Sequence, residues 1–269
     1  MTPFSRALRP YTLALFLAAG GIAHAGLIGF FPLNGNANDA SGNGNNGTIQ
    51  GNITFGGTGP FGGQAAIFPG DNVTSNGASI NTPDFISVPI DTSAENNPGE
   101  TFGGWFLVSP TADQTHIRGL ISSDNGNFDP TLDIDTRAGG FQYSVFLGGN
   151  VAFGPGAATG QWTFVAVSYD NVAHTWVAQV NSATGSGTTG FDGNGVEGIT
   201  YLGINPHFDF EFNGQMADVF FFNNAMTLAQ LNAIRLGGPA AILAPEPATA
   251  GLMGVALIGL GLVRRRRSR

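Results

Sequence analysis

The chain of 269 residues contains no cysteine, and all ten of its basic residues are arginine, so it has no lysine. The lack of cysteine excludes disulfides, thiolate metal sites and a cysteine nucleophile. Charged residues make up 10% of the chain, against about 25% in typical domains. This scarcity excludes a coiled coil, a polybasic protein and a disordered acidic tail. Hydrophobic residues, at 42%, are sufficient for a core.

The N-terminus has the pattern of a secretory signal peptide over Met1–Ala25. Arg6 and Arg9 precede the apolar run Tyr11–Ile22, and Ala23 and Ala25 supply the small residues of an A-x-A cleavage site. We therefore expect export, with a mature chain that begins at Gly26.

The C-terminus, residues 245–269, has a second targeting pattern. Pro245, Glu246 and Pro247 precede sixteen uncharged residues, 248–263, and a cluster of arginines follows. The cluster consists of Arg264, Arg265, Arg266, Arg267 and Arg269. As a helix the uncharged run would span about 24 Å, against about 30 Å of hydrocarbon. The arginines are expected to stay on the cytoplasmic side of a membrane.

This three-part tail resembles the PEP-CTERM sorting signal of Gram-negative bacteria. The resemblance implies removal by the membrane protease exosortase after signal peptidase has acted. It also implies transient anchoring in the inner membrane and a final place at the cell surface or outside the cell, in an organism that makes extracellular polysaccharide. An ordinary short transmembrane anchor is the alternative, and in either case the domain would be extracytoplasmic.

Between the two ends the charge balance is strongly acidic. Residues 26–244 contain three arginines and 17 acidic residues, a net charge of −14. Such a charge repels nucleic acid and anionic lipid, so we expect no nucleic-acid partner. It is compatible with Ca²⁺, which prefers clustered oxygen ligands.

Short β-branched and aromatic runs alternate with Gly, Asn, Pro and Asp, which predicts an all-β domain. The central runs Phe102–Val108 and Trp162–Val167 are almost continuously apolar, as in strands buried on both faces. The expected strands are Leu27–Leu33, Gly47–Gln50, Ala65–Phe68, Phe85–Ile90, Thr101–Ser109, Gly119–Ser123, Thr131–Asp135, Phe141–Leu147, Trp162–Asp170, Thr175–Asn181, Thr200–Ile204 and Gly214–Asn223.

One short helix is expected near the end of the domain. Thr227 is a suitable N-cap, Leu228, Leu231 and Ile234 follow at helical spacing with Leu236 as a further candidate, and glycines end the helix. We interpret residues 239–244 as a linker. One sandwich or jelly roll accounts for this pattern.

Six segments in order resemble the laminin-G-like (LamG) jelly roll. The resemblance implies a concanavalin A-like sandwich of two antiparallel sheets over residues 26–238, in a family whose members more often bind glycans, proteins or Ca²⁺ than catalyse. Pro69 and Ala217 depart from acidic positions of the family pattern, which weakens an inherited metal site. The matching segments are Phe31–Gly44, Ala66–Asp71, Thr101–Phe106, Gln161–Asp170, Phe212–Val219 and Thr227–Leu231.

A calcium site is one prediction for the mature domain. Asn34 and Asp39 lie in a loop rich in Gly and Asn, and Asp218 on the last strand could meet this loop in space. Asp71 is a second candidate on another loop. The alternative is that Asp39 caps a turn by bonding its own backbone.

Exposed aromatic side chains could form a sugar platform, because their flat apolar faces cover the C–H faces of sugars. Trp176, Tyr143 and Phe208 are the candidates, and Phe208 alternates with Phe210 and Phe212. Trp105 and Trp162 lie in apolar strands and are expected in the core.

An enzyme is the least favoured class. Asp133 and Asp135 share a strand face, as do Asp209 and Glu211, but such pairs on exposed strands are normally solvated. We therefore expect no catalytic residues and predict a module that binds carbohydrate or matrix components, with or without Ca²⁺. A structural or adhesive protein that binds protein partners is the main alternative.

Overall fold

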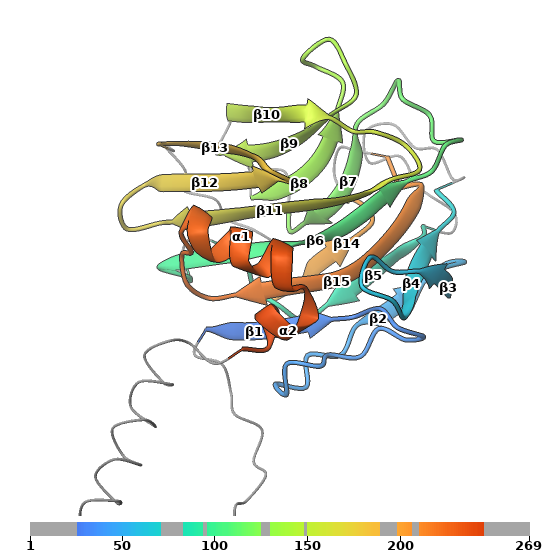
Figure 1. Cartoon of the computed structure of the whole chain (residues 1–269), viewed down its shortest axis with the longest axis horizontal. Coiled ribbons are helices and arrows are strands. Elements are labelled where there is room, and N and C mark those ends of the chain that lie inside the picture. The colour runs from blue at the N-terminus through green and yellow to red at the C-terminus, as the bar shows by residue number, and fades with distance from the viewer. Residues whose placement is uncertain are drawn as a thin grey trace, which may run out of the picture.

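The computed structural model describes residues 26–70, 83–93, 96–124, 130–147, 150–188, 198–205 and 210–244. Within these ranges the chain forms two facing antiparallel sheets with two short helices outside one of them (Figure 1). The predicted signal peptide and sorting segment lie outside the described residues. None of the described helices is long and apolar enough to cross a membrane.

Sheet A contains eight strands, and β1 (Leu27–Phe31) pairs only with β15. First and last strands are therefore neighbours, which brings residues far apart in the sequence together. The other strands follow the order β13 (Ala183–Thr188), β12 (Thr175–Val180), β11 (Trp162–Asp170), β6 (Gly99–Val108), β15 (Gly214–Phe222), β4 (Gln64–Phe68) and β3 (Thr54–Thr58).

Sheet B contains seven strands and faces sheet A across the core. Its order is β10 (Asn150–Gly156), β9 (Gln142–Leu147), β8 (Thr131–Asp135), β7 (Arg118–Ser122), β14 (Thr200–Leu202), β5 (Phe85–Val88) and β2 (Thr48–Gln50). The all-β antiparallel sandwich expected from the sequence is thus confirmed.

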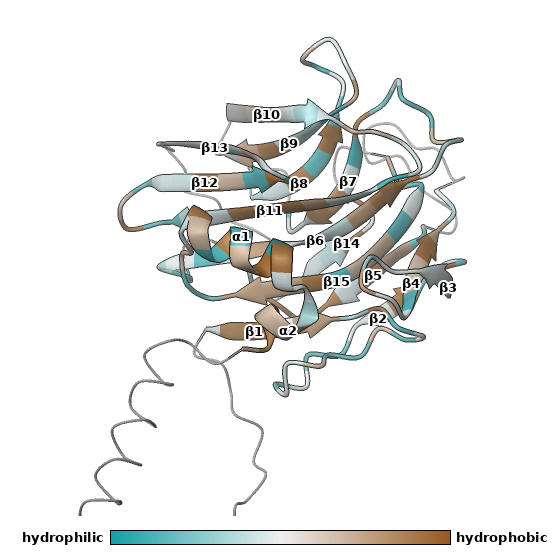
Figure 2. Cartoon of the chain, viewed as in Figure 1, coloured by the Kyte–Doolittle hydropathy of each residue, from teal (hydrophilic) through white to brown (hydrophobic). Residues whose placement is uncertain are grey.

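The main core lies between the sheets. Phe102 and Val165 point into it from sheet A, and Leu132 and Ile134 meet them from sheet B. The central strands β6 and β11 are buried along nearly their whole length, as their continuous apolar runs predicted, and much of their length is brown in Figure 2. They are buried on both faces because helix α1 (Leu228–Gly237) covers the outer face of sheet A.

Helix α1 begins with a capping box, in which Thr227 accepts from the Gln230 N–H and the Gln230 side chain accepts from the Thr227 N–H. Leu231 and Ile234 pack against Trp105 in a second apolar cluster. The predicted N-cap and docking are confirmed. Leu236 is exposed, so its place in the apolar stripe was wrong.

Three strands were not expected, and all are rich in glycine: β3, β10 and β13. Each pairs with the strand that precedes or follows it, so hairpin closure compensates for weak strand propensity. The stretch expected to be a linker contains the helix α2 (Pro239–Ile242). Buried Ile242 anchors α2 to the cluster beneath α1, which is why these residues are ordered against the sheet.

Candidate functional site

A cleft opens where the two sheets end side by side. It is bounded by β9 and β10 of sheet B and by β11, β12 and β13 of sheet A. These strands lie at the upper left of the sandwich in Figure 1. We call this hollow the edge cleft.

The lining of the edge cleft is mostly apolar and carries no charged residue. Ala152 and Gly154 form one wall, and Ala178 and Val180 face them from sheet A. None of the 14 lining residues is acidic or basic, and Thr184 is the most exposed polar side chain among them. The small side chains leave the space that makes the cleft, and its neutrality favours a neutral ligand.

Trp176 lies in this cleft on the inner face of β12. Its indole ring rests on β13, because Gly185 and Gly187 leave room there. A Cβ at Gly187 would lie 2.8 Å from the indole Nε1, whereas a Cβ at Gly185 would be at an ordinary 3.4 Å from the ring. Glycine at these positions therefore allows the ring to lie flat at the open side of the sandwich.

Tyr143, the second aromatic candidate, lines the same cleft from β9. Its hydroxyl is buried, and burial raises the pKa of Tyr143 to about 12, against a smaller opposing effect of the Thr163 hydroxyl. The ring thus forms part of the cleft floor, while the hydroxyl is turned away from solvent.

The third candidate, Phe208, lies outside the described residues. Its expected partners in a platform, Phe210 and Phe212, are both buried. Phe212 packs in the main core against Phe68, and Phe210 lies against the His116 ring, with centroids 4.0 Å apart. These two phenylalanines are therefore core residues, which contradicts a platform built from their alternation.

Asp39 of the proposed calcium loop is bonded on both carboxylate oxygens. Oδ1 accepts from the Phe30 N–H at 3.0 Å and the Ser41 N–H at 2.8 Å. Oδ2 accepts from the Ser41 hydroxyl at 2.8 Å and the Asn45 N–H at 3.0 Å. The carboxylate thus caps its own turn and also ties the loop to β1.

The same loop covers the free edge of β1. The Asn43 side chain donates to the Leu27 carbonyl at 2.8 Å, and the Asn45 side chain donates to the Ile28 carbonyl at 2.7 Å. Side chains therefore take the place of a neighbouring strand, which blocks pairing with another chain at this edge. This accounts for the density of Asn and Asp that marked the segment in the sequence.

Asn34 follows β1 in the chain, and Asp218 lies in β15, the strand that pairs with β1. The Asn34 side-chain oxygen accepts from the Gln64 N–H at 2.9 Å, and the Asp218 N–H donates to the Pro32 carbonyl at 3.3 Å. Asp71 lies outside the described residues. Within the described part of the chain no group of three or more His, Asp or Glu is placed to hold a metal ion. Calcium binding stays a prediction.

Asp218 sits in a bulge of β15 with a positive φ of 53°. Its side chain is buried, and this burial raises the pKa of Asp218 to about 7. No hydrogen bond to its carboxylate comes from any residue that the structure describes. Ionisation of Asp218 at neutral pH therefore destabilises the folded state.

The carboxylate pair Asp133 and Asp135 is buried, although exposure was expected. Asp133 Oδ2 accepts from the Thr131 hydroxyl at 2.8 Å, and Asp135 accepts from Arg137 at both oxygens. Their side chains point to the outer face of sheet B, since Leu132 and Ile134 point into the core. Asp135 is thus a structural ion-pair partner.

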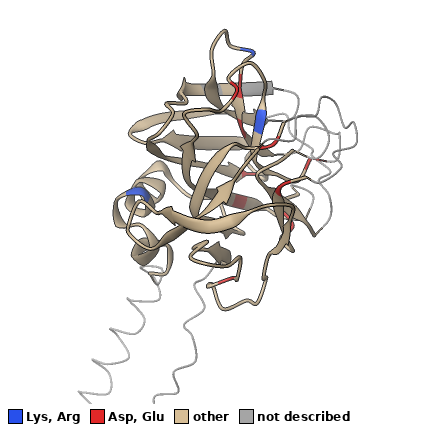
Figure 3. Ribbon diagram, turned by 90° about the vertical axis from the view of Figure 1, so that its right-hand side faces the viewer, with Lys and Arg blue, Asp and Glu red and all other residues tan. Residues whose placement is uncertain are grey.

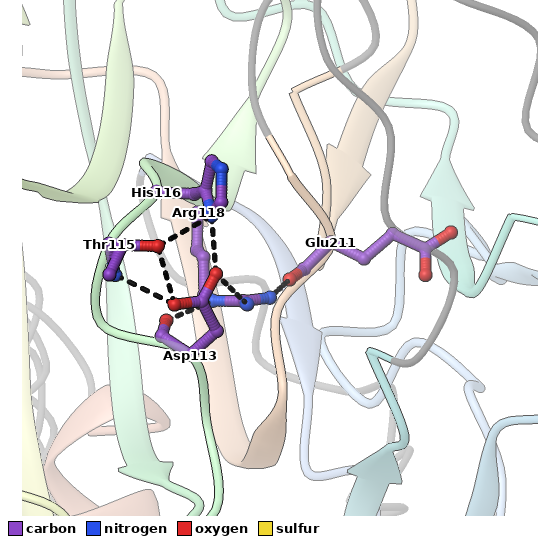
Figure 4. A network of polar contacts seen from close by, with 5 residues as sticks. All are labelled: Asp113, Thr115, His116, Arg118 and Glu211. Atoms are coloured by element: carbon purple, nitrogen blue, oxygen red, sulfur yellow. Dashed lines mark hydrogen bonds and ion pairs between the residues drawn. The ribbon is translucent and has the colours of Figure 1, made fainter.

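A polar network joins the loop before β7 to the segment that leads into β15 (Figure 4). Buried Arg118 donates to the Asp113 carbonyl at 2.9 Å and to the Glu211 carbonyl at 2.5 Å. Thr115 and His116 donate to the Asp113 carboxylate and hold its pKa well below the usual range. Burial lowers the pKa of Arg118. The network clamps two segments together, and nothing in the sequence pattern had indicated it.

Charge is distributed unevenly around the sandwich. Figure 3 shows the described acidic residues mostly on the side away from helix α1. Helix α1 itself carries the basic residue Arg235 in its last turn. The edge cleft has no charged lining residue. The acidic surface therefore does not extend into the cleft.

No protein-family model matches the sequence, and no curated protein matches it. Solved structures are similar in fold. Domain 4 of AbnA, a GH43 extracellular arabinanase from Geobacillus stearothermophilus, in complex with arabinotriose, is 23% identical with a TM-score of 0.56. The match covers 77% of this chain and 97% of that one.

Two toxin domains are also similar. The receptor binding domain of botulinum neurotoxin C/D mosaic serotype is 15% identical with a TM-score of 0.58, covering 79% of this chain and 51% of that one. The binding domain of Paraclostridial Mosquitocidal Protein 1 is 10% identical with a TM-score of 0.57, covering 78% and 52%. The chain thus spans about half the length of these toxin domains. At such identities the likeness shows a shared β-sandwich fold.

Proposed function

We propose that this chain is an exported binding module that recognises neutral carbohydrate of an extracellular polysaccharide or matrix. The sugar would contact Trp176 in the edge cleft. The single observation that carries the proposal is the flat placement of an indole ring at the open side of an uncharged cleft.

The chemistry of the cleft fits such a ligand. An indole face offers a large apolar surface with an N–H at its edge, which suits a sugar that has apolar C–H faces and polar rims. Neutral lining side chains would not repel a neutral sugar and would leave a charged group without a partner.

The related folds support binding over catalysis. One similar domain was solved with arabinotriose, and others are receptor binding domains of toxins. The LamG resemblance of the sequence favours the same class. No set of catalytic groups emerged from the described residues, in which Asp135 and Asp113 are held in structural contacts.

The two ends of the chain supply the proposed location. Signal peptidase would cleave after Ala25, and exosortase would act on the tail that begins at Pro245. The inner membrane would hold the precursor through residues 248–263 until sorting to the surface of a Gram-negative cell. Calcium dependence is part of the proposal, with Asn34, Asp39, Asp71 and Asp218 as its candidate ligands.

The test is a binding assay of residues 26–244 against a panel of polysaccharides and glycans, with Ca²⁺ and again with EDTA. We expect saturable binding to a neutral glycan that is lost in a Trp176→Ala variant and kept in Trp162→Ala. Trp162 is the matched control, because it lies outside the cleft and its Nε1 donates to the Thr58 carbonyl.

Two results would count against the proposal. If a folded sample binds no glycan in either condition, the structural or adhesive alternative takes its place, and protein partners would be sought. If binding is the same with EDTA, the calcium part is wrong and the sugar site stands.

A further inference from the structure

We propose that the corner of the domain formed by Phe61, Leu236 and Leu243 lies against the phospholipid bilayer while the tail is still attached. We call these three side chains the α2 corner. The inference rests on the export and sorting part of the proposed function, and it adds which face of the domain the membrane meets.

The α2 corner is a group of exposed apolar side chains near one end of the domain's helices. Leu236 is 65% exposed, Phe61 45% and Leu243 38%, and they are three of the six large hydrophobic side chains exposed in the described part of the chain. All three lie near the junction of α1 and α2, because Phe61 packs on Gly238, where a Cβ would lie 2.7 Å from its ring, Leu236 precedes Gly238 by two residues, and Leu243 directly follows α2. Exposed apolar groups gathered in this way mark interaction surfaces.

The corner is also held rigidly to the sheet. Ile242 of α2 is buried, and Phe61 meets Trp105 edge-to-face with ring centroids 5.0 Å apart. The Gly238 N–H donates to the Ile234 carbonyl and links the end of α1 to the start of α2. The apolar side chains are therefore presented by a fixed scaffold.

The short connection between the domain and the uncharged run limits how far the α2 corner can lie from the bilayer. Only residues 245–247 separate Ala244 from the uncharged run 248–263. Four Cα–Cα steps reach at most about 14 Å, at about 3.6 Å each. If residue 248 enters the hydrocarbon, Ala244 must lie within this distance of it, in or just above the headgroup layer.

The charges around the corner favour the same orientation. No acidic residue occurs between Asp39 and Asp71 or between Asp218 and Glu246, and these two segments supply all three side chains of the corner. The remaining sequence of residues 26–244 carries the 17 acids. An anionic lipid surface would therefore repel most faces of the domain but not this one.

The test uses the full chain in phospholipid vesicles that contain a headgroup-labelled nitroxide lipid. Since the chain has no cysteine, a fluorophore can be attached to a single introduced one. Labels at Leu236→Cys and Leu243→Cys report on the corner, and a label at Ala256→Cys reports on the tail. A label at Ala138→Cys is the control, in the exposed β8–β9 loop at the opposite end of the sandwich from α2 (Figure 1).

We expect the nitroxide to quench the labels at 236, 243 and 256, with a blue shift of emission at 236 and 243, and to leave the label at 138 unquenched. A chain that ends at Ala244 should lose the quenching at 236 and 243. If the label at 256 is quenched while those at 236 and 243 behave as at 138, the tail inserts but the inference is overturned. If the label at 256 is also unquenched, the membrane anchor and the inference both fail. The carbohydrate-binding part of the proposed function would not be affected by this result, because the glycan-binding assay tests it separately.

Discussion

Replacing Asp218 by asparagine should stabilise the domain by an amount that grows with pH. Asp218 is buried in the bulge of β15, and its pKa is raised to about 7 from an ordinary value of 3.8. Asparagine is the appropriate change, because its side chain is similar in shape and it also tolerates the positive φ of this position.

The sign of the effect follows from proton binding. Below pH 4 the carboxyl is protonated in both folded and unfolded chains, so it contributes nothing. Between pH 4 and pH 7 the unfolded chain loses the proton while the folded chain keeps it, which favours unfolding. The stability of the natural domain should therefore fall as pH rises through this window, and then level off above the folded pKa.

The magnitude follows from the same shift. A pKa raised from 3.8 to about 7 corresponds to about 4 kcal/mol, at about 1.4 kcal/mol per pKa unit. Urea unfolding of residues 26–244 in EDTA at pH 4, 5.5 and 8 would measure it, with EDTA present because bound Ca²⁺ would favour the ionised form of Asp218. The advantage of Asp218→Asn over the natural chain should increase by up to about 4 kcal/mol between pH 4 and pH 8.

A glycine variant separates charge from backbone strain. Asp218→Gly should show the same dependence on pH, with a constant offset, because glycine adopts the positive φ without steric cost. An advantage of Asp218→Asn that is equal at pH 4 and pH 8 would refute the argument, since the cost would not then come from ionisation.

Three further stability predictions use the same unfolding assay. Leu231→Ala should cost about 2–5 kcal/mol because it leaves a cavity under α1, whereas exposed Leu236→Ala should change stability by less than about 0.5 kcal/mol; equal costs would contradict the docking of α1. Arg118→Leu should cost about 3 kcal/mol, because two carbonyls and a carboxylate lose a buried donor, while Arg235→Leu, whose guanidinium bonds Asn232 on the same helix, should cost less than about 1 kcal/mol. Asp39→Ala should cost about 2 kcal/mol or more through four lost hydrogen bonds; a neutral result would show that the loop does not secure β1.

The sequence predicted the elements whose signal is local and strong. The apolar runs of β6 and β11 identified the central strands, and Thr227 with Leu231 and Ile234 identified α1. The burial of β6 and β11 on both faces could be predicted, because apolar residues occupy both faces of each run. The sequence analysis also expected the last strand to meet the loop after the first one, and β15 pairs with β1.

Other features depend on tertiary packing and had no local signal. The glycine-rich strand β13 forms because β12 offers it a partner, and its glycines admit the indole of Trp176. Asp133 and Phe212 alternate as exposed residues would, yet both are buried. The edge cleft combines small residues from five strands, and alanine or glycine gives no sign of which cavity it will line. Trp176 and Tyr143 were named from the sequence, but their meeting in one cleft was not.

The most direct test of the account is a tryptophan-fluorescence titration of residues 26–244 with the glycan that the panel identifies. The change in emission should be absent in Trp176→Phe and present in Trp162→Phe. Gly187→Ala should weaken binding at least tenfold, because its Cβ would displace the indole. If Trp176→Phe and Gly187→Ala bind as tightly as the natural domain, the edge cleft is not the carbohydrate site.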